Sequence, residues 1–140
     1  MKKNAQLMPM ISVDSVERAR TFYVETLGFN HIMGMLGKDG NLDFCTVVLD
    51  GAKIMLTRPR EKTEGIGPSA SKRPVGIYFE VEDVKAFHDQ VKKRGARITD
   101  PITSQWWGDR TFKVIDPYGY EIWFYETVGE PVPPQGAKLV

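Results

Sequence analysis

Several features that would narrow the function of a protein at once are scarce in this chain. Its 140 residues include a single cysteine, so no disulfide can form within it. The net charge is +1, which argues against nucleic acid or a strongly acidic protein as a partner. No apolar run approaches the ~20 residues that span a bilayer, and the N-terminus lacks the apolar segment of a signal peptide. The sequence therefore predicts a cytoplasmic protein that binds neither nucleic acid nor a membrane.

Histidine is almost as scarce as cysteine. His31 opens an expected strand, and His88 lies between Phe87 and Asp89 on the charged face of an expected helix. Isolated histidines at such positions are usually surface side chains, so we interpret neither as a metal ligand or a base. Cys45 stands in the apolar run "FCTVVL" and is interpreted as a small core residue rather than a nucleophile.

A regular alternation of short elements is what the chain does have, and it occurs twice. The order strand–helix–strand–strand–strand is predicted for residues 8–57 and again for residues 75–126. In the first half, Asp14 is expected to cap the helix and Gly28 to end it. Residues 59–74 are polar and rich in Gly, Pro and Ser, a composition typical of a linker or loop. The expected strands are 8–13, 31–36, 44–49, 53–57, 75–81, 96–102, 110–115 and 120–126, and the expected helices are 14–28 and 83–95.

The two halves correspond with a constant offset. Val13 and Val81 each close the first strand of a half and are 68 residues apart. The turn glycines Gly51 and Gly119 have the same separation, so that "GAKIML" and "GYEIWF" align without a gap. Half-domains of about 55 residues are marginal alone, so we expect them to pack together as one domain over residues 1–127. Its parts would be module one at about 8–58, the linker 59–74 and module two at about 75–127, followed by a Pro-rich tail at 128–140.

Two stretches of the sequence resemble a known superfamily. "VDSVERARTFYVETLGF" and "VIDPYGYEIWFYE" are similar to the first helix and the final hairpin of the vicinal oxygen chelate superfamily, which includes glyoxalases, extradiol dioxygenases and bleomycin-resistance proteins. "WWGDRTF" is similar to a "WGxRxF" stretch of the bleomycin-resistance-like members. The resemblance implies an α+β fold of two tandem βαβββ modules. Their curved mixed sheets would form a cleft or half-barrel with the helices on the outer face. It also implies a homodimer.

Metal-using members of this superfamily take two ligands from each half, one from the first strand and one from the last strand. The motifs place the first-strand positions at Met8 and Gly76 and the last-strand positions at Met55 and Trp123. None of these four residues is a usual ligand for a hard or borderline divalent ion. We therefore expect no metal and no other cofactor, and we expect a binding protein more than an enzyme.

Alternation along the strands divides their side chains between two faces. Positions such as Ile54, Ile122 and Phe124 are uniformly apolar and are expected to pack under the helices. The opposite positions mix aromatic, thioether and charged groups, which is typical of a binding cavity. Tyr118, in the last turn, is expected to be exposed to solvent. The candidate ligand-binding residues are Met10, Lys53, Met55, Tyr78, Glu80, Trp106, Trp107, Arg110, Glu121, Trp123 and Tyr125.

Three classes of function follow from these features. The first is a metal-free protein of the bleomycin-resistance kind that sequesters a hydrophobic or aromatic small molecule, such as a drug or toxin. The second is a lyase, an isomerase or another enzyme that works in the same cavity without the usual metal, with Glu80 or Glu121 as general base. The third is a structural module whose cavity is vestigial. The residues at the metal positions favour the first. Because bleomycin-binding members are strongly acidic and this chain is close to neutral, another aromatic ligand fits as well as bleomycin.

Overall fold

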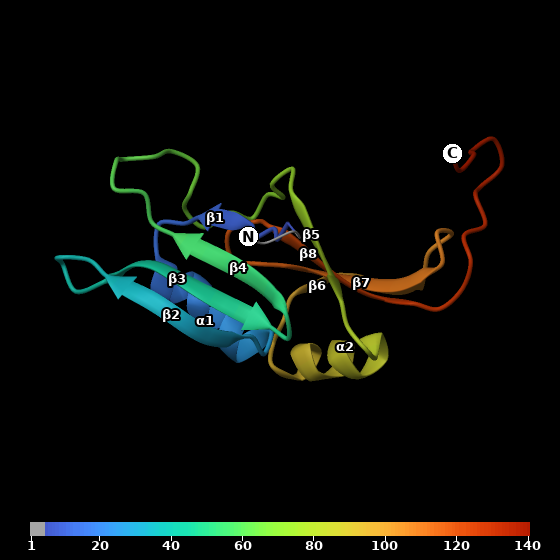
Figure 1. The fold of residues 1–140 in the computed structure, drawn as a ribbon, viewed down its shortest axis with the longest axis horizontal. Helices are drawn as coiled ribbons and strands as arrows, with labels where there is room; N and C mark the ends of the chain where they lie inside the picture. The colour runs from blue at the N-terminus through green and yellow to red at the C-terminus, as the bar shows by residue number, and fades with distance from the viewer. Residues whose placement is uncertain (1–4) are drawn as a thin grey trace. The chain divides into compact units, whose positions relative to one another are not determined.

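The computed structural model describes residues 5–140, which divide into two compact units between Ala70 and Ser71. The first unit contains module one and the second contains module two, each with a four-stranded sheet and a helical segment (Figure 1). In each sheet one strand pair is parallel and the others are antiparallel. The predicted α+β fold of two tandem βαβββ modules with curved mixed sheets is confirmed. Among the described residues, no helix has both the length and the apolar character needed to cross a membrane.

Module one is a four-stranded sheet with a helical segment after its first strand. Its elements are β1 (Met10–Ser12), α1 (Val16–Thr21), the π-helix η1 (Phe22–Thr26), β2 (Asn30–Leu36), β3 (Leu42–Leu49) and β4 (Ala52–Thr57). The strand order is β1-β4-β3-β2, and β1 pairs in parallel with β4. Register shifts interrupt the pairing of β2 with β3, whereas β3 and β4 pair continuously.

Module two repeats this plan. Its elements are β5 (Gly76–Glu80), α2 (Val84–Lys93), β6 (Ile98–Ser104), β7 (Asp109–Ile115) and β8 (Glu121–Thr127). The strand order is β5-β8-β7-β6, again with the first and last strands parallel. Met10 lies opposite Met55 in module one, and Tyr78 lies opposite Trp123 in module two. Both residues of the second pair follow those of the first by 68 positions, so the duplication predicted from the sequence extends to the strand register.

The start of the first helix differs from the expectation. Its N-cap is Ser15, whose side chain accepts a hydrogen bond from the backbone N–H of Arg18 at 3.2 Å. The prediction that Asp14 caps this helix is therefore wrong. Glu17 does not close a capping box, because its carboxylate accepts a hydrogen bond from the backbone N–H of Leu42 at 2.7 Å. This bond ties the first turn of the helix to the start of β3.

The second part of the same helix also differs from the expectation. We expected one α-helix, but its second part is π-helical, and Leu27 donates its backbone N–H to the carbonyl of Phe22, five residues earlier. Gly28 follows with a φ of +85°, a conformation that favours glycine. The prediction that Gly28 ends the helix is confirmed.

The helix of each module covers one face of its sheet, which we call the helix face; the other is the open face (Figure 1). Buried apolar side chains occupy the helix face, as strand alternation predicts. In module two Phe124 is fully buried, with its ring 5.7 Å from Phe79 and 5.3 Å from Phe112. The buried strand residues that the sequence assigned to this face are Ile11, Ile54, Leu56, Phe79, Ile122 and Phe124.

The last turn departs from the prediction for its aromatic residue. The Asp116 carboxylate accepts backbone hydrogen bonds from Tyr118 and Tyr120, each at 2.9 Å, and so closes the turn. Tyr118 is fully buried, and its carbonyl accepts a hydrogen bond from the Arg73 guanidinium. The prediction that Tyr118 is exposed is wrong, because this tight turn directs the ring away from solvent.

Candidate ligand-binding site

Four aromatic side chains of module two form a connected group, which we call the aromatic cluster: Tyr78, Trp107, Trp123 and Tyr125. The rings of Tyr78 and Tyr125 are stacked, with centroids 4.3 Å apart and planes 18° apart. The Trp123 ring is 5.9 Å from Tyr78 and tilted by 50°. Tyr78 is 44% exposed, and the other three are half-buried, so the cluster is reachable from solvent.

Hydrogen bonds fix Tyr78 and Trp107 of the aromatic cluster in place. The Tyr78 hydroxyl donates to Asp109 Oδ2 at 2.7 Å and accepts from Trp107 Nε1 at 2.9 Å. Thr127 Oγ1 donates to the other carboxylate oxygen of Asp109 at 2.8 Å. Burial, together with the bond to Asp109, raises the pKa of Tyr78 to about 12, so its hydroxyl stays protonated at neutral pH. Two aromatic side chains are thereby fixed in position before any ligand arrives.

Trp123 stands at the last-strand position where the superfamily resemblance predicts a metal ligand in metal-using members. A Cβ atom on Gly76 would lie 3.3 Å from the indole nitrogen of Trp123, so the glycine leaves room for this ring. Lys113 Nζ lies 4.4 Å from the centroid of the Trp123 ring, a cation–π distance. Module two therefore has an indole and a bare backbone at its two metal positions, and neither offers a suitable donor for a divalent ion.

Behind Trp123 lies a network of charged side chains. Lys113 Nζ is 3.0 Å from Glu121 and 3.3 Å from Asp100, and Lys72 is 3.1 Å from Glu121. Burial disfavours the charge on Glu121, but the hydrogen bonds from Lys113 and Lys72 outweigh it and lower the pKa of this carboxyl. Burial of Lys113 is likewise outweighed by its bonds to Glu121 and Asp100, which raise the pKa of the ammonium. Both ends of this network stay charged at neutral pH.

The turn that carries the other two tryptophans is held by the C-terminal tail. The carbonyl of Gly108 accepts backbone hydrogen bonds from Val128 at 2.9 Å and Gly129 at 3.0 Å. The carbonyl of Trp106 accepts one from Val132 at 2.6 Å. Trp106 is 42% exposed and packs edge-on against Trp107, whose indole N–H reaches Tyr78. The first residues of the tail thus brace the turn that completes the aromatic cluster.

The candidate residues of module one lie on its open face and have a different chemistry. Met10 is 63% exposed and pairs in register with Met55, which is half-buried. Lys53 is exposed two residues before Met55 on the same strand. Thr46 lies opposite Met55 on β3, and Met33 lies opposite Thr46 on β2. This face is therefore rich in thioether groups where module two is aromatic.

Four predicted site residues of module two lie outside the aromatic cluster: Trp106, which packs against Trp107, Glu121, which is paired with Lys113, and Glu80 and Arg110. Arg110 lies 4.0 Å from Glu126, which accepts a hydrogen bond from the backbone N–H of Val84 at the start of α2. This arrangement puts Arg110 on the helix face. Glu80 lies opposite Tyr125 and is exposed.

Sequence reasoning also left out two residues that the cluster uses, Asp109 and Lys113. Lys113 lies opposite Trp123, and Asp109 lies opposite Thr127, so both belong to the open face. Alternation along β7, counted from its pairing with β8, is the signal that could have identified them.

The interpretation of His88 as a surface residue is also wrong, because its side chain is mostly covered and its ring lies 5.1 Å from Phe112.

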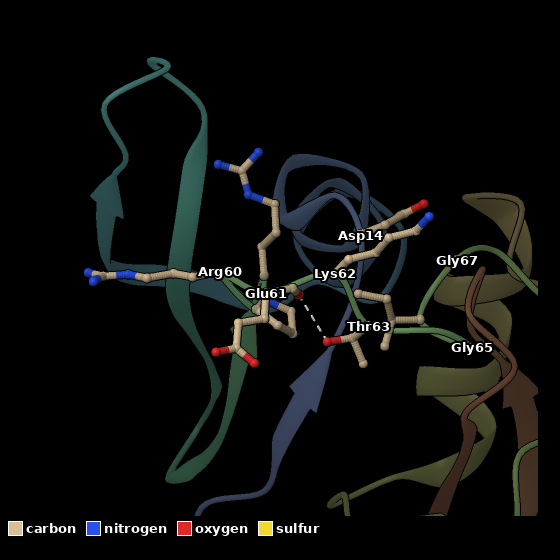
Figure 2. A pocket seen from close by; sticks show the side chains of 10 residues that line it. Asp14, Arg60, Glu61, Lys62, Thr63, Gly65 and Gly67 are labelled. Carbon is tan, nitrogen blue, oxygen red and sulfur yellow. Dashed lines mark hydrogen bonds between the residues drawn. The ribbon is translucent and has the colours of Figure 1, made fainter.

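A hollow in the loop after β4 was not indicated by the sequence (Figure 2). It is lined by Asp14, Arg58, Pro59, Arg60, Glu61, Lys62, Thr63, Gly65, Ile66 and Gly67. The loop is fastened by a hydrogen bond from the Asp14 backbone N–H to the Ile66 carbonyl at 3.0 Å, and Thr63 Oγ1 donates to the Glu61 carbonyl at 3.1 Å. The lining carries charges of both signs and no aromatic ring, so it offers less to a planar ligand than the aromatic cluster does.

The described residues do not bring a set of metal donors together. Within residues 5–140, no three His, Cys, Asp or Glu side chains come together in a way that could hold a metal ion. The four superfamily positions carry Met8, Met55, Gly76 and Trp123, which do not fit a divalent ion.

Comparisons with known proteins agree with this architecture. An uncharacterised protein of Mycobacterium bovis is 30% identical over 130 residues, covering 90% of this chain and 83% of the relative. A bleomycin resistance protein of Geobacillus stearothermophilus is 27% identical over 138 residues, covering 88% and 97%. The crystal structure of TnmS3, an antibiotic binding protein from Streptomyces sp. CB03234, has the same fold, with a TM-score of 0.65, 23% identity, and coverage of 94% and 100%. The sequence model of the Glyoxalase/Bleomycin resistance protein/Dioxygenase superfamily matches residues 6–124, and the chain belongs to this superfamily.

Proposed function

We propose that the protein binds a planar aromatic or amphipathic small molecule on the aromatic cluster of module two and sequesters it without a metal. The single observation that carries this proposal is the cluster itself, in which exposed Tyr78 is stacked on Tyr125 and fixed through Asp109 and Trp107. Aromatic groups of this kind are worth ~0.5–1.5 kcal/mol per stacked contact beyond the area that they bury. Because the rings are already ordered, binding a ligand costs little further side-chain entropy.

Its relatives support this proposal by what their names say. A relative 27% identical to this chain is a bleomycin resistance protein, and a protein of the same fold is an antibiotic binding protein. The aromatic cluster is a suitable surface for a ligand of either kind, since large planar groups bind by stacking. Resistance by sequestration needs affinity and no chemical step, which is consistent with residues that do not fit a metal.

The enzyme alternative receives less support. Glu121, one of the two carboxylates considered as a general base, is paired with Lys113 and Lys72, and its pKa is lowered. A general base works best when its pKa lies near the working pH, so this carboxylate is a poor acceptor of protons. The exposure of Tyr78 argues against the vestigial alternative, because a cavity filled by the protein's own side chains would cover this ring.

The proposal is tested by identifying what the protein carries. The protein would be purified from its own host and analysed by native mass spectrometry and by elemental analysis after dialysis. We expect an organic molecule with an aromatic group, whose re-addition raises the Tm, and no stoichiometric divalent metal. A retained Zn, Ni, Mn or Fe ion bound at Met8, Met55, Gly76 or Trp123 would contradict the metal-free part. Failure of a broad set of aromatic antibiotics to shift the Tm would contradict the binding part.

Two further parts of this proposal concern the state of the protein in the cell. The superfamily resemblance suggests a homodimer and a single domain made by both modules, and the open face of module one supports this with exposed apolar side chains, Met10 among them. Sedimentation at micromolar concentration should give the mass of two chains, and a monomer would contradict the dimer. A cytoplasmic location stays a prediction, and fractionation of the host cells would test it.

A further inference from the structure

The Tyr78–Tyr125 end of the aromatic cluster contains a buried negative charge. Asp109 is 9% exposed, and its two oxygens accept hydrogen bonds from the hydroxyl groups of Tyr78 and Thr127. No Lys, Arg or His between residues 5 and 140 lies within 4.0 Å of this carboxylate. A buried carboxylate is normally paired with a cation, and the residues that the structure describes supply none to Asp109.

A second carboxylate acts at the same end. Glu80 lies opposite Tyr125 in the pairing of β5 with β8 and is exposed. Burial raises the pKa of the Tyr125 hydroxyl, and the negative charges of Glu80 and Asp109 raise it further. Both carboxylates are therefore close enough to be felt at the Tyr125 hydroxyl. The field at this end is negative although the whole chain has a net charge of +1.

The opposite end of the cluster differs in this respect. Lys113 already lies 4.4 Å from the Trp123 ring centroid and is neutralised by Glu121 and Asp100. An ammonium on an aromatic face, backed by carboxylates, is thus already present within this module. At the other end, Tyr78 and Tyr125 lie near the carboxylates of Asp109 and Glu80, but the described residues place no equivalent ammonium group beside them.

The hydrogen bond of Tyr78 strengthens the case for a cation. Its hydroxyl donates to a carboxylate at 2.7 Å, which moves electron density toward the phenol ring and makes the face of the ring more negative. Cations are attracted to such faces, most strongly where little water separates them. With 44% of Tyr78 exposed, a ligand can reach this ring.

We propose that the ligand of the aromatic cluster is a cation: a planar or amphipathic molecule with a protonated amine or a quaternary ammonium group, whose positive charge lies beside Tyr78 and Tyr125 and faces Asp109 and Glu80. This inference rests on the proposed function, since it names the chemical class that the same site selects. The selectivity comes from the field of one end of the site and not from the net charge of the protein.

Three tricyclic probes of nearly equal shape test this selectivity. They are 9-aminoacridine, a cation at pH 7, neutral acridine, and the anion acridine-9-carboxylate, each titrated against intrinsic tryptophan fluorescence. The cation should bind at least about tenfold more tightly than the neutral probe, and the anion most weakly. Added salt should weaken the binding of the cation and leave that of acridine nearly unchanged.

Variants locate the charge that is responsible. Asp109→Asn keeps the shape of the side chain, and its amide oxygen can still accept one of the two hydrogen bonds that Asp109 accepts. It should lower the affinity for 9-aminoacridine about tenfold while acridine binds as before. Glu80→Gln, at an exposed position that should not disturb folding, is expected to lower it by a smaller factor. Asp100→Asn is the matched control, because Asp100 is bonded to Lys113 at the other end of the cluster.

The outcomes separate this inference from the proposed function. Equal binding of all three probes would overturn the cation preference and leave small-molecule binding intact. No binding of any probe to the folded wild-type protein would overturn both. An unchanged preference in both Asp109→Asn and Glu80→Gln would show that the selectivity arises elsewhere and would overturn the inference.

Discussion

Module one and module two share a topology, and their parallel strand pairs share a register at an offset of 68 residues, but their open faces differ in chemistry. The open face of module one pairs Met10 with Met55, whereas that of module two pairs Tyr78 with Trp123. The helix faces differ far less, since Leu56 and Phe124 occupy equivalent positions and both are fully buried. Packing under the helix thus restricts the helix face of each sheet to apolar residues, whereas the residues of the open face can vary with function.

The two modules also differ in how their turns are supported. Gly40 and Gly108 are equivalent by the same offset, and both have a positive φ, +81° and +98°. Nothing lies within 4 Å of a Cβ built on Gly40, whereas one built on Gly108 would lie 2.3 Å from the carbonyl oxygen of Gly129. The C-terminal tail braces the turn of module two, and this is the turn that carries Trp107. The tail is thus part of the asymmetry between the modules.

The largest effects are expected where the modules are alike. Leu56→Ala should lower the free energy of unfolding by ~2–5 kcal/mol and Phe124→Ala by ~3–5 kcal/mol, because both leave cavities in a close-packed core. Denaturant titration followed by circular dichroism would measure both. Leu36→Ala, at a position 67% exposed, is the control and should change stability by less than ~0.5 kcal/mol. A cost below ~1 kcal/mol at either core position would break the equivalence of the helix faces.

The next effect should distinguish the two turns. Gly40→Ala introduces only the strain of a positive φ, about 1 kcal/mol, whereas Gly108→Ala adds a clash with the tail and should cost at least about twice as much. Gly129→Ala is the control, since a Cβ there meets nothing within 4 Å. Urea unfolding of the three variants gives the comparison.

The role of the tail is isolated by repeating this comparison in a chain that ends at Thr127. There the excess cost of Gly108→Ala over Gly40→Ala should disappear, because the carbonyl of Gly129 is gone. Equal costs of the two substitutions in the full chain would contradict the brace.

Features of the fold and the candidate site that follow from a periodic sequence pattern could be predicted from the sequence. Features that depend on contacts between distant residues could not. Strand alternation and the internal offset were sufficient to assign Ile54 and Ile122 to the helix face and to assign Tyr78 and Trp123 to the opposite face. The bond between Tyr78 and Asp109 joins residues 31 positions apart on separate strands, so no local pattern reports it.

Local chemistry also misled where two neighbouring residues could serve the same purpose. Asp14 and Ser15 are both good N-cap residues, and the backbone geometry, which the sequence does not reveal, selects Ser15. Arg110 was assigned to the site from a motif, although its strand parity, once β7 is paired with β8, places it on the helix face.

The open faces should differ in binding by a smaller amount of free energy. Trp123→Ala should weaken 9-aminoacridine binding by more than ~1 kcal/mol, about the value of one aromatic contact, while the protein stays folded. Met55→Ala, at the equivalent position in module one, should leave this binding nearly unchanged, because the proposed site is the aromatic cluster of module two. Fluorescence titration and unfolding would be measured for both variants. A loss of ~3–5 kcal/mol of stability in Trp123→Ala with no change in binding would favour a vestigial, core-like role for this ring.

The smallest expected effect is on the stability of the fold at acidic pH. The folded-state pKa of Glu121 is lowered below its usual value of 4.5 by its bonds to Lys113 and Lys72, which outweigh its burial. A carboxyl with a lowered folded pKa adds stability above its unfolded pKa and loses it as the pH falls. The wild-type protein should therefore lose stability as the pH drops below about 4.5, and Glu121→Gln should flatten this part of the curve.

Asp39, a carboxyl of module one that is also paired with a cation, sharpens the comparison. Hydrogen bonds from Arg58 and Asn41 lower the pKa of Asp39 to about 2, but Asp39 is exposed, and solvent screens its charge. Asp39→Asn should therefore change the acid limb less than Glu121→Gln does, although the pKa of Asp39 is lowered strongly. Urea midpoints at pH 7, 5, 4 and 3 would be compared for the wild type and both variants. A larger effect of Asp39→Asn would mean that burial beside the aromatic cluster does not strengthen the charge network of module two.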